Sequence, residues 1–76
     1  MNIVDKLLDI GCLFVEQNDD IIKISYLPLS KMKVNINIKT HEISVIGSDH
    51  LNDFHSFEWH KNYAKDIQDI INILEN

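Results

Sequence analysis

Histidines recur in the last third of the chain, and clustered imidazoles are the commonest protein ligands for zinc. His50, His55 and His60 follow one another at intervals of five residues. A helix brings ligands to one face only at spacings of three or four, so this spacing does not build a helical metal site. We therefore expect no bound metal and histidines that face solvent.

Carboxylates lie among these histidines and could pair with them for acid–base chemistry. Asp49, Asp53 and Glu58 are the nearest acids in the chain. Catalysis would also need a nucleophile or a phosphate-binding loop, and the sequence has neither motif and only two glycines. The sequence predicts no catalytic residue, no cofactor and no enzymatic activity.

Net charge is the remaining chemical feature. Twelve Asp and Glu residues against seven Lys and no Arg give a charge of −5. A negative field repels nucleic acid and anionic membranes, and the missing Arg removes the usual bidentate phosphate reader. The charge therefore indicates no direct nucleic-acid or membrane partner, and favours a protein with a basic surface.

The segment 32–39 organises the fold that must position these charges. Its residues alternate between apolar and polar, the period of a strand with one buried face. The polar face carries Lys33, Asn35, Asn37 and Lys39. The apolar face carries Met32, Val34, Ile36 and Ile38, and needs a cover.

Other segments predict further strands and a first helix. Residues 3–10 form an amphipathic helix that Gly11 ends, because glycine favours the left-handed residue after a helix. Strands are expected around 13–15, at 21–26 with Ile22, Ile24 and Tyr26 on one face, and at 42–46 with Ile43 and Val45 inward. The order predicts an up-and-down antiparallel meander of four strands.

The C-terminal third predicts one long helix, which packs on one face of the sheet. Its start lies somewhere between Ser48 and Phe57, where Ser48, Asp49, Asp53 and Ser56 could each cap it. A stripe at helical spacing would complete the core: Trp59, Tyr63, Ile67, Ile70, Ile71 and Leu74. The predicted class is α+β, with a short N-terminal helix, four strands and this helix in a single domain, residues 1–76.

In such a meander the first hairpin tip, the turn at Thr40 and His41 and the end of the long helix lie at one end. This end would collect six acids: Glu16, Asp19, Asp20, Glu42, Asp69 and Glu75. We expect these acids to bind the partner, with Asp19 and Asp20 at the centre. A surface of this kind can imitate nucleic acid and occupy a basic groove.

Two stretches give the chain a resemblance to a known family. The segment 1–10 is similar in character to the first helix of a type II-A inhibitor among the small acidic anti-CRISPR proteins of phages, and Trp59-x-x-x-Tyr63 repeats a pair in its C-terminal region. The resemblance implies an inhibitor that blocks a CRISPR effector, with acidic residues that imitate DNA.

Two other classes fit the same build. An immunity protein or antitoxin that neutralises a basic toxin would also be small and acidic. A homodimeric interaction module would use an exposed sheet edge, for which residues 13–15 are the candidate. The lone Cys12 predicts a buried thiol, and the absence of a signal peptide or long apolar run predicts a soluble cytoplasmic protein.

Overall fold

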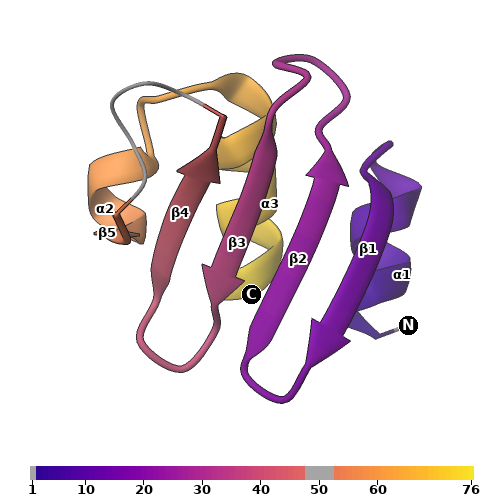
Figure 1. Ribbon diagram of the computed structural model, residues 1–76, viewed down its shortest axis with the longest axis horizontal. Coiled ribbons are helices and arrows are strands. Elements are labelled where there is room, and N and C mark those ends of the chain that lie inside the picture. Colours follow the sequence, from indigo (N-terminus) through magenta and orange to yellow (C-terminus); the bar gives the residue numbers. More distant parts are fainter. Residues whose placement is uncertain (1, 48–52) are drawn as a thin grey trace.

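A computed structural model describes residues 2–47 and 53–76, and its fold is α+β, as the sequence predicts (Figure 1). A short helix is followed by an antiparallel sheet and then by helices. The elements are α1 (Ile3–Asp9), β1 (Leu13–Asn18), β2 (Ile21–Tyr26), β3 (Lys33–Asn37), β4 (Glu42–Ile46), β5 (His55–Ser56), α2 (Phe57–His60) and α3 (Lys65–Glu75).

The sheet has the strand order β1-β2-β3-β4-β5, and every neighbouring pair is antiparallel. The expected meander of four strands is therefore present, with one addition. The two-residue strand β5 pairs with Glu42 and Ile43 at the start of β4. It is too short to leave an alternating pattern in the sequence.

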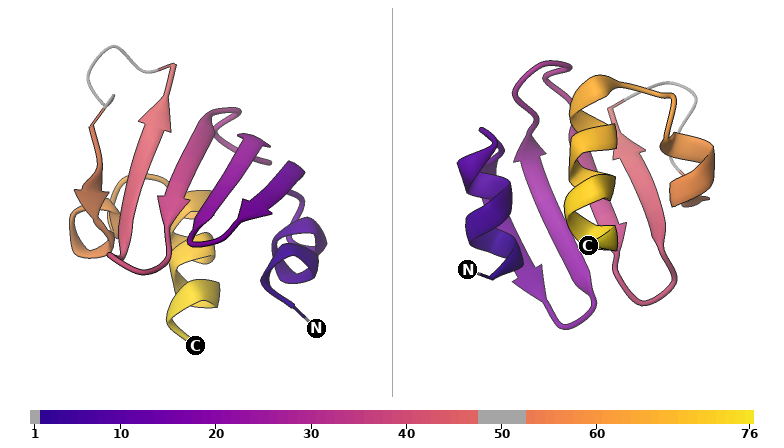
Figure 2. Two further views of the ribbon diagram at one scale, coloured as in Figure 1. Left: turned by 60° about the horizontal axis from the view of Figure 1, so that its bottom comes forward. Right: turned by 180° about the vertical axis from the view of Figure 1, so that it is seen from behind.

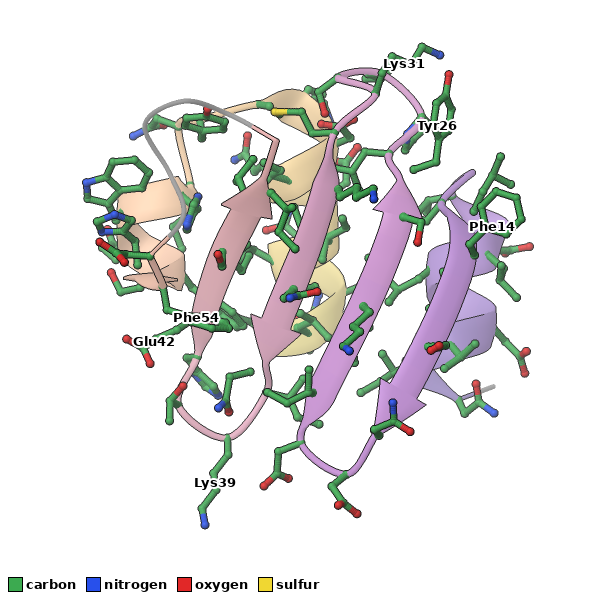
Figure 3. The ribbon with its side chains drawn as sticks, in the orientation of Figure 1. Phe14, Tyr26, Lys31, Lys39, Glu42 and Phe54 are labelled. Carbon is green, nitrogen blue, oxygen red and sulfur yellow. The ribbon has the colours of Figure 1, made fainter. Side chains whose placement is uncertain are left out.

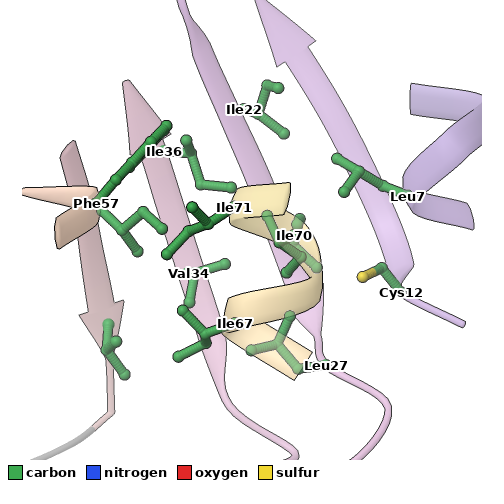
Figure 4. Close-up of a cluster of buried hydrophobic side chains, with 13 residues drawn as sticks. Leu7, Cys12, Ile22, Leu27, Val34, Ile36, Phe57, Ile67, Ile70 and Ile71 are labelled. Carbon is green, nitrogen blue, oxygen red and sulfur yellow. The ribbon is translucent and has the colours of Figure 1, made fainter. Parts of the chain in front are cut away.

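The molecule has two layers, because α1 and α3 lie on the same face of the sheet (Figure 2). The period-two pattern of β3 explains the burial on this face: Val34 and Ile36 are fully buried, whereas Lys33 is exposed. The helix α3 contributes Ile67, Ile70 and Ile71 to the same core. Figure 4 shows these side chains meeting between the layers.

The remaining core positions follow the sequence pattern closely. Ile43 and Val45 are buried, and so is the thiol of Cys12, whose pKa burial raises to about 11. Met32, Ile38 and Leu74 are partly buried and pack against the core.

The prediction of one long C-terminal helix is wrong. The four-residue helix α2 ends at His60, and residues 61–63 form turns before Ala64 adopts an extended backbone and α3 begins. The stripe from Trp59 to Ile67 is therefore not continuous. Trp59 and Tyr63, expected in the core, are 49% and 38% exposed.

Two of the four expected caps of the C-terminal helix lie among the described residues. Ser56, one of the four expected caps, caps α2 by accepting a hydrogen bond from the amide of Trp59 at 3.1 Å. The candidate caps Ser48 and Asp49 lie outside the described residues.

The first helix ends as expected, at a glycine. The Gly11 amide donates to the Leu8 carbonyl and the Cys12 amide to the Leu7 carbonyl, the two hydrogen bonds of a Schellman motif. Gly11 has φ of 100°, and a Cβ there would lie 3.2 Å from Cβ of Pro28. Backbone geometry and the closeness of Pro28 thus both require glycine.

Truncation of the central core residue should measure how much the two layers depend on each other. Ile36→Ala should lower the free energy of unfolding by about 2–5 kcal/mol, because a cavity would form between β3 and α3. Urea unfolding measures the change. Leu29→Ala, which truncates a 64% exposed side chain, is the control and should change stability by less than about 0.5 kcal/mol.

Candidate functional site

The β1–β2 tip, formed by Asp19 and Asp20, is the centre of the candidate site. Asn18 pairs with Ile21, so Asp19 and Asp20 between them make a two-residue hairpin loop. Asp19 has φ of 53°, and a positive φ at the first loop residue is what the favoured hairpin turns require. The tip is therefore where the sequence predicts it.

Hydrogen bonds to the backbone carbonyls of both loop residues hold this tip in place. The Ile38 amide donates to the Asp20 carbonyl at 2.9 Å, and the Gln17 side-chain amide donates to the Asp19 carbonyl at 3.3 Å. The first bond joins the β1–β2 tip to the turn between β3 and β4. Both carboxylates are thus carried on a fixed backbone.

The carboxylates of Asp19 and Asp20 are exposed. Within residues 2–47 and 53–76 they form no hydrogen bond or ion pair. Two like charges side by side in water repel each other weakly. Folding therefore uses their backbone groups and leaves both charges free.

Glu16 and Glu42 lie on the sheet at different distances from the tip. Glu16 is exposed and lies opposite Lys23 in the strand register. Glu42 begins β4, on the far side of the sheet from β1 (Figure 3). Lys39 projects from the β3–β4 turn in the same figure, so the acidic end is interrupted by a positive charge.

The two acids of α3 are paired with lysines. Asp69 forms an ion pair with Lys65, and Glu75 lies 3.6 Å from Lys61. Lys61 also pairs with Glu58 at 3.0 Å. These lysines reduce the field of Asp69 and Glu75, whereas the carboxylates of Glu16, Asp19, Asp20 and Glu42 have no ion pair among the described residues.

His60 is fully buried, which corrects the expectation that the histidines face solvent. Its Nε2 lies 2.8 Å from the carbonyl oxygen of Ile43 and donates to it. Its Nδ1 is buried and has no hydrogen-bond partner among the described residues. Burial lowers the pKa of His60 below its usual 6.5, the bond to Ile43 opposes this shift, and nearby His55 adds to it.

Aromatic rings surround this histidine on the solvent side. Trp59 stacks on His55, with ring centroids 4.4 Å apart, and on Tyr63, at 5.9 Å. His60 meets Trp59 edge to face at 4.8 Å. Trp59 and Tyr63 therefore cover His60 and are not part of the main core.

Asp66 is a second buried polar residue that sequence reasoning missed. Its Oδ2 accepts hydrogen bonds from the amides of Leu29 and Ser30, at 2.9 and 2.8 Å, and from the Ser30 hydroxyl at 3.0 Å. Burial alone would raise the pKa of Asp66. These bonds, with one from the Ile67 amide, outweigh burial and lower it.

Metal sites and membrane-spanning helices are two further features that we sought among the described residues. No group of three or more His, Cys, Asp or Glu side chains there could hold a metal ion. No described helix is both long and apolar enough to cross a membrane. His50 and Asp49 lie outside the described residues.

Acidification should destabilise the fold through His60. The unfolded chain takes up a proton near pH 6.5 and the folded chain only at lower pH, so stability should fall as pH drops below about 7. His60→Phe should flatten this part of a plot of urea midpoint against pH. His41→Gln, which removes an exposed histidine, should keep the slope, and equal slopes in all three proteins would contradict the prediction.

Removal of the Asp66 carboxylate should release the β2–β3 loop, residues 27–32. Asp66→Ala should cost at least ~1.5–3 kcal/mol, the range for hydrogen bonds to a charged group. It should also speed hydrogen exchange of the Leu29 and Ser30 amides. In the wild type, the contribution of Asp66 should be present above its usual pKa of 3.8 and be lost as pH falls through its lower folded value.

Asp69→Ala is the matched control for Asp66→Ala, because it removes an acid of the same helix from a surface ion pair. It should cost less than about 1 kcal/mol. Unchanged exchange at Leu29 and Ser30 in Asp66→Ala would contradict the role given to this carboxylate.

Comparison of the chain with protein-family models, curated proteins and solved structures finds no match. The resemblance to anti-CRISPR proteins therefore rests on the expected order of a short helix, a small antiparallel sheet and a helical C-terminal part, with matched residues only in the segment 1–10 and the Trp59–Tyr63 pair. Function has to be argued from the geometry of this chain.

Proposed function

We propose that the protein is a stoichiometric inhibitor, with no enzymatic activity of its own, that binds a basic surface on a nucleic-acid-handling protein. The observation that carries this proposal is the β1–β2 tip. Asp19 and Asp20 are exposed and have no ion pair among the described residues, and hydrogen bonds from the Ile38 amide and the Gln17 side chain hold their backbone in place.

Folding accounts for only part of this arrangement. Asp tolerates the left-handed conformation of residue 19, but Asn or Gly would serve that position equally well. No side-chain contact requires a second charge at residue 20. A basic partner gives both charges a role, because exposed acids steer the approach of a positive surface.

The fixed backbone favours this role. A partner that binds the tip does not have to order a mobile loop, and so avoids that entropic cost. Glu16 and Glu42 add negative charge on the same sheet. Asp69 and Glu75 add less, because Lys65 and Lys61 already neutralise them.

The class of partner follows from the resemblance and the charge. A CRISPR effector has a basic groove for nucleic acid, and the resemblance to type II-A inhibitors makes such an effector the first candidate. A basic toxin would be recognised by the same charges. The charges of the tip therefore do not distinguish a CRISPR effector from a basic toxin. Only identification of the target separates these two classes of partner.

Charge reversal at the tip tests the proposal. The protein should inhibit DNA cleavage by a purified, guide-loaded type II-A effector at a molar ratio near one. Asp19→Lys combined with Asp20→Lys should lower the affinity at least tenfold, while the urea midpoint should fall only slightly, because Lys adopts the left-handed conformation of residue 19 less readily than Asp. Wild-type affinity should fall with added salt, since the screening length is about 8 Å at physiological ionic strength.

A second double variant controls for net charge. Asp9→Lys with Asp53→Lys also replaces two exposed acids and likewise changes the net charge from −5 to −1, because each reversal adds two units. It should inhibit like the wild type. Equal losses in both double variants, or an affinity that is flat with salt, would overturn the acidic-tip mechanism. Binding and inhibition of a basic toxin instead would favour the immunity-protein alternative.

A further inference from the structure

The strand β1 forms the outer edge of the sheet. It pairs with β2 on one side, and no described strand lies on the other. Only Val15 among its six residues is partly buried. The outer side of β1 therefore offers unpaired backbone groups to another chain.

Two of the residues that commonly protect an edge strand are missing from β1. It contains neither Lys nor Pro, and its one charge, Glu16, lies opposite Lys23. Val15 to Asn18 pair continuously with β2, so the regular part of this edge is four residues long, and Phe14 interrupts the ladder before it. Edges left open in this way are the sites at which extended peptides add to a sheet.

Phe14 marks the apolar end of this edge. Its side chain is 75% exposed and projects beyond β1 in Figure 3. Its φ is 58°, a conformation that is unusual for a bulky residue and that glycine would adopt without strain. Strained residues are concentrated at functional sites, and no described contact accounts for this phenylalanine.

The helix α1 extends the back layer past the last strand. It lies over β1 and reaches beyond the outer edge in Figures 1 and 2. Leu8 and Ile10 are 47% and 36% exposed at its C-terminal end. A further strand beside β1 would therefore find part of its apolar cover already in place.

We propose that β1 binds an extended segment of a partner protein as a sixth strand, apolar at one end and basic at the other. The apolar end would contact the edge patch, formed by Leu8, Ile10, Leu13 and Phe14. The basic end would lie beside Asp19 and Asp20, which directly follow β1. The basic end rests on the proposed function, whereas the apolar end and the open edge do not.

A second copy of this chain fits the edge less well. Antiparallel pairing of two β1 strands about their centre would place the apolar Val15 of each copy opposite the charged Glu16 of the other, an unfavourable pair that occurs twice. Each chain also carries a net charge of −5. The charge at the tip instead complements a positive segment.

Synthetic peptides of six to eight residues, capped at both ends, are the probes. One carries lysines at its N-terminal end and valine and isoleucine at its C-terminal end, as antiparallel pairing requires. A second has the reverse order, for parallel pairing. Titration into the isotopically labelled full chain should shift amide signals of residues 13–18 and slow their hydrogen exchange. Every second amide of a bound peptide would face β1. N-methylation of these amides should abolish binding, whereas N-methylation of the other set should not.

Variants of the chain separate the two ends of the site. Phe14→Asp should weaken peptide binding at least tenfold, and Phe14→Gly should weaken it while the urea midpoint stays equal or rises. Leu29→Asp, which changes an exposed leucine in the β2–β3 loop, should bind like the wild type. Reversal of Asp19 and Asp20 should reduce both the affinity and its dependence on salt.

Each failure has a distinct meaning. No signal change in β1 with either peptide, or equal binding of both N-methylated patterns, would overturn strand addition and leave inhibition by the tip standing. Binding that depends on Phe14 but not on Asp19 and Asp20 would overturn the basic end of the segment. A dimer at micromolar concentration that Phe14→Asp dissociates would overturn the proposal in favour of a second copy.

Discussion

The carboxylate of Asp66 joins the first turn of α3 to the β2–β3 loop, 36 residues earlier in the chain. The position of α3 over the sheet depends on this contact, because Ala64 provides no side-chain cap at the helix start. With α3 in place, Ile67, Ile70 and Ile71 cover Val34 and Ile36. The negative charge also lies at the positive end of the helix dipole, which stabilises it there. The buried acid thus fixes the first turn of α3 to the β2–β3 loop, and the apolar core fills the space between the two layers.

A second buried polar contact fixes the helix α2 at the β4 end of the sheet. Nε2 of His60 binds the carbonyl oxygen of Ile43 and so holds α2 against β4. The chain between His60 and Asp66 has to turn to satisfy both contacts, and α2 and α3 are separate helices for this reason. Trp59 and Tyr63 are displaced from the core as a consequence and become the cover of His60.

The sheet could be predicted from the sequence because its signal is local. Alternation in β3 fixes which residues are buried, and Gly11 and the residues at 18–20 mark the chain reversals. The break between α2 and α3 could not be predicted in this way. No Pro or Gly lies between residues 57 and 76, and the spacing of Trp59, Tyr63 and Ile67 fits a continuous helix. The contacts that break it involve Ile43 and Ser30, which are distant in sequence.

Some features of the candidate site could likewise be predicted from local sequence, and others could not. The tip at Asp19 and Asp20 follows from hairpin chemistry that the sequence displays. The pair of Lys65 and Asp69 has helical spacing and could have been recognised, whereas the contact between Lys61 and Glu75 crosses the helix break. Phe14 lies in an ordinary apolar run, and only its backbone conformation distinguishes it.

The connectivity of the sheet has a consequence for synthesis on the ribosome. Strands β1 to β4 are joined by short turns and can pair one after another as the chain emerges. The helix α1 can cover part of their apolar face, but the rest stays open to water until α3, the last element of this fold, has left the ribosome. Until then Val34 and Ile36 lack the cover of Ile67, Ile70 and Ile71, and exposed apolar surfaces of this kind are what chaperones recognise. The last eleven-residue helix therefore acts as the closing step of folding, and truncation within it would leave a sheet prone to aggregation.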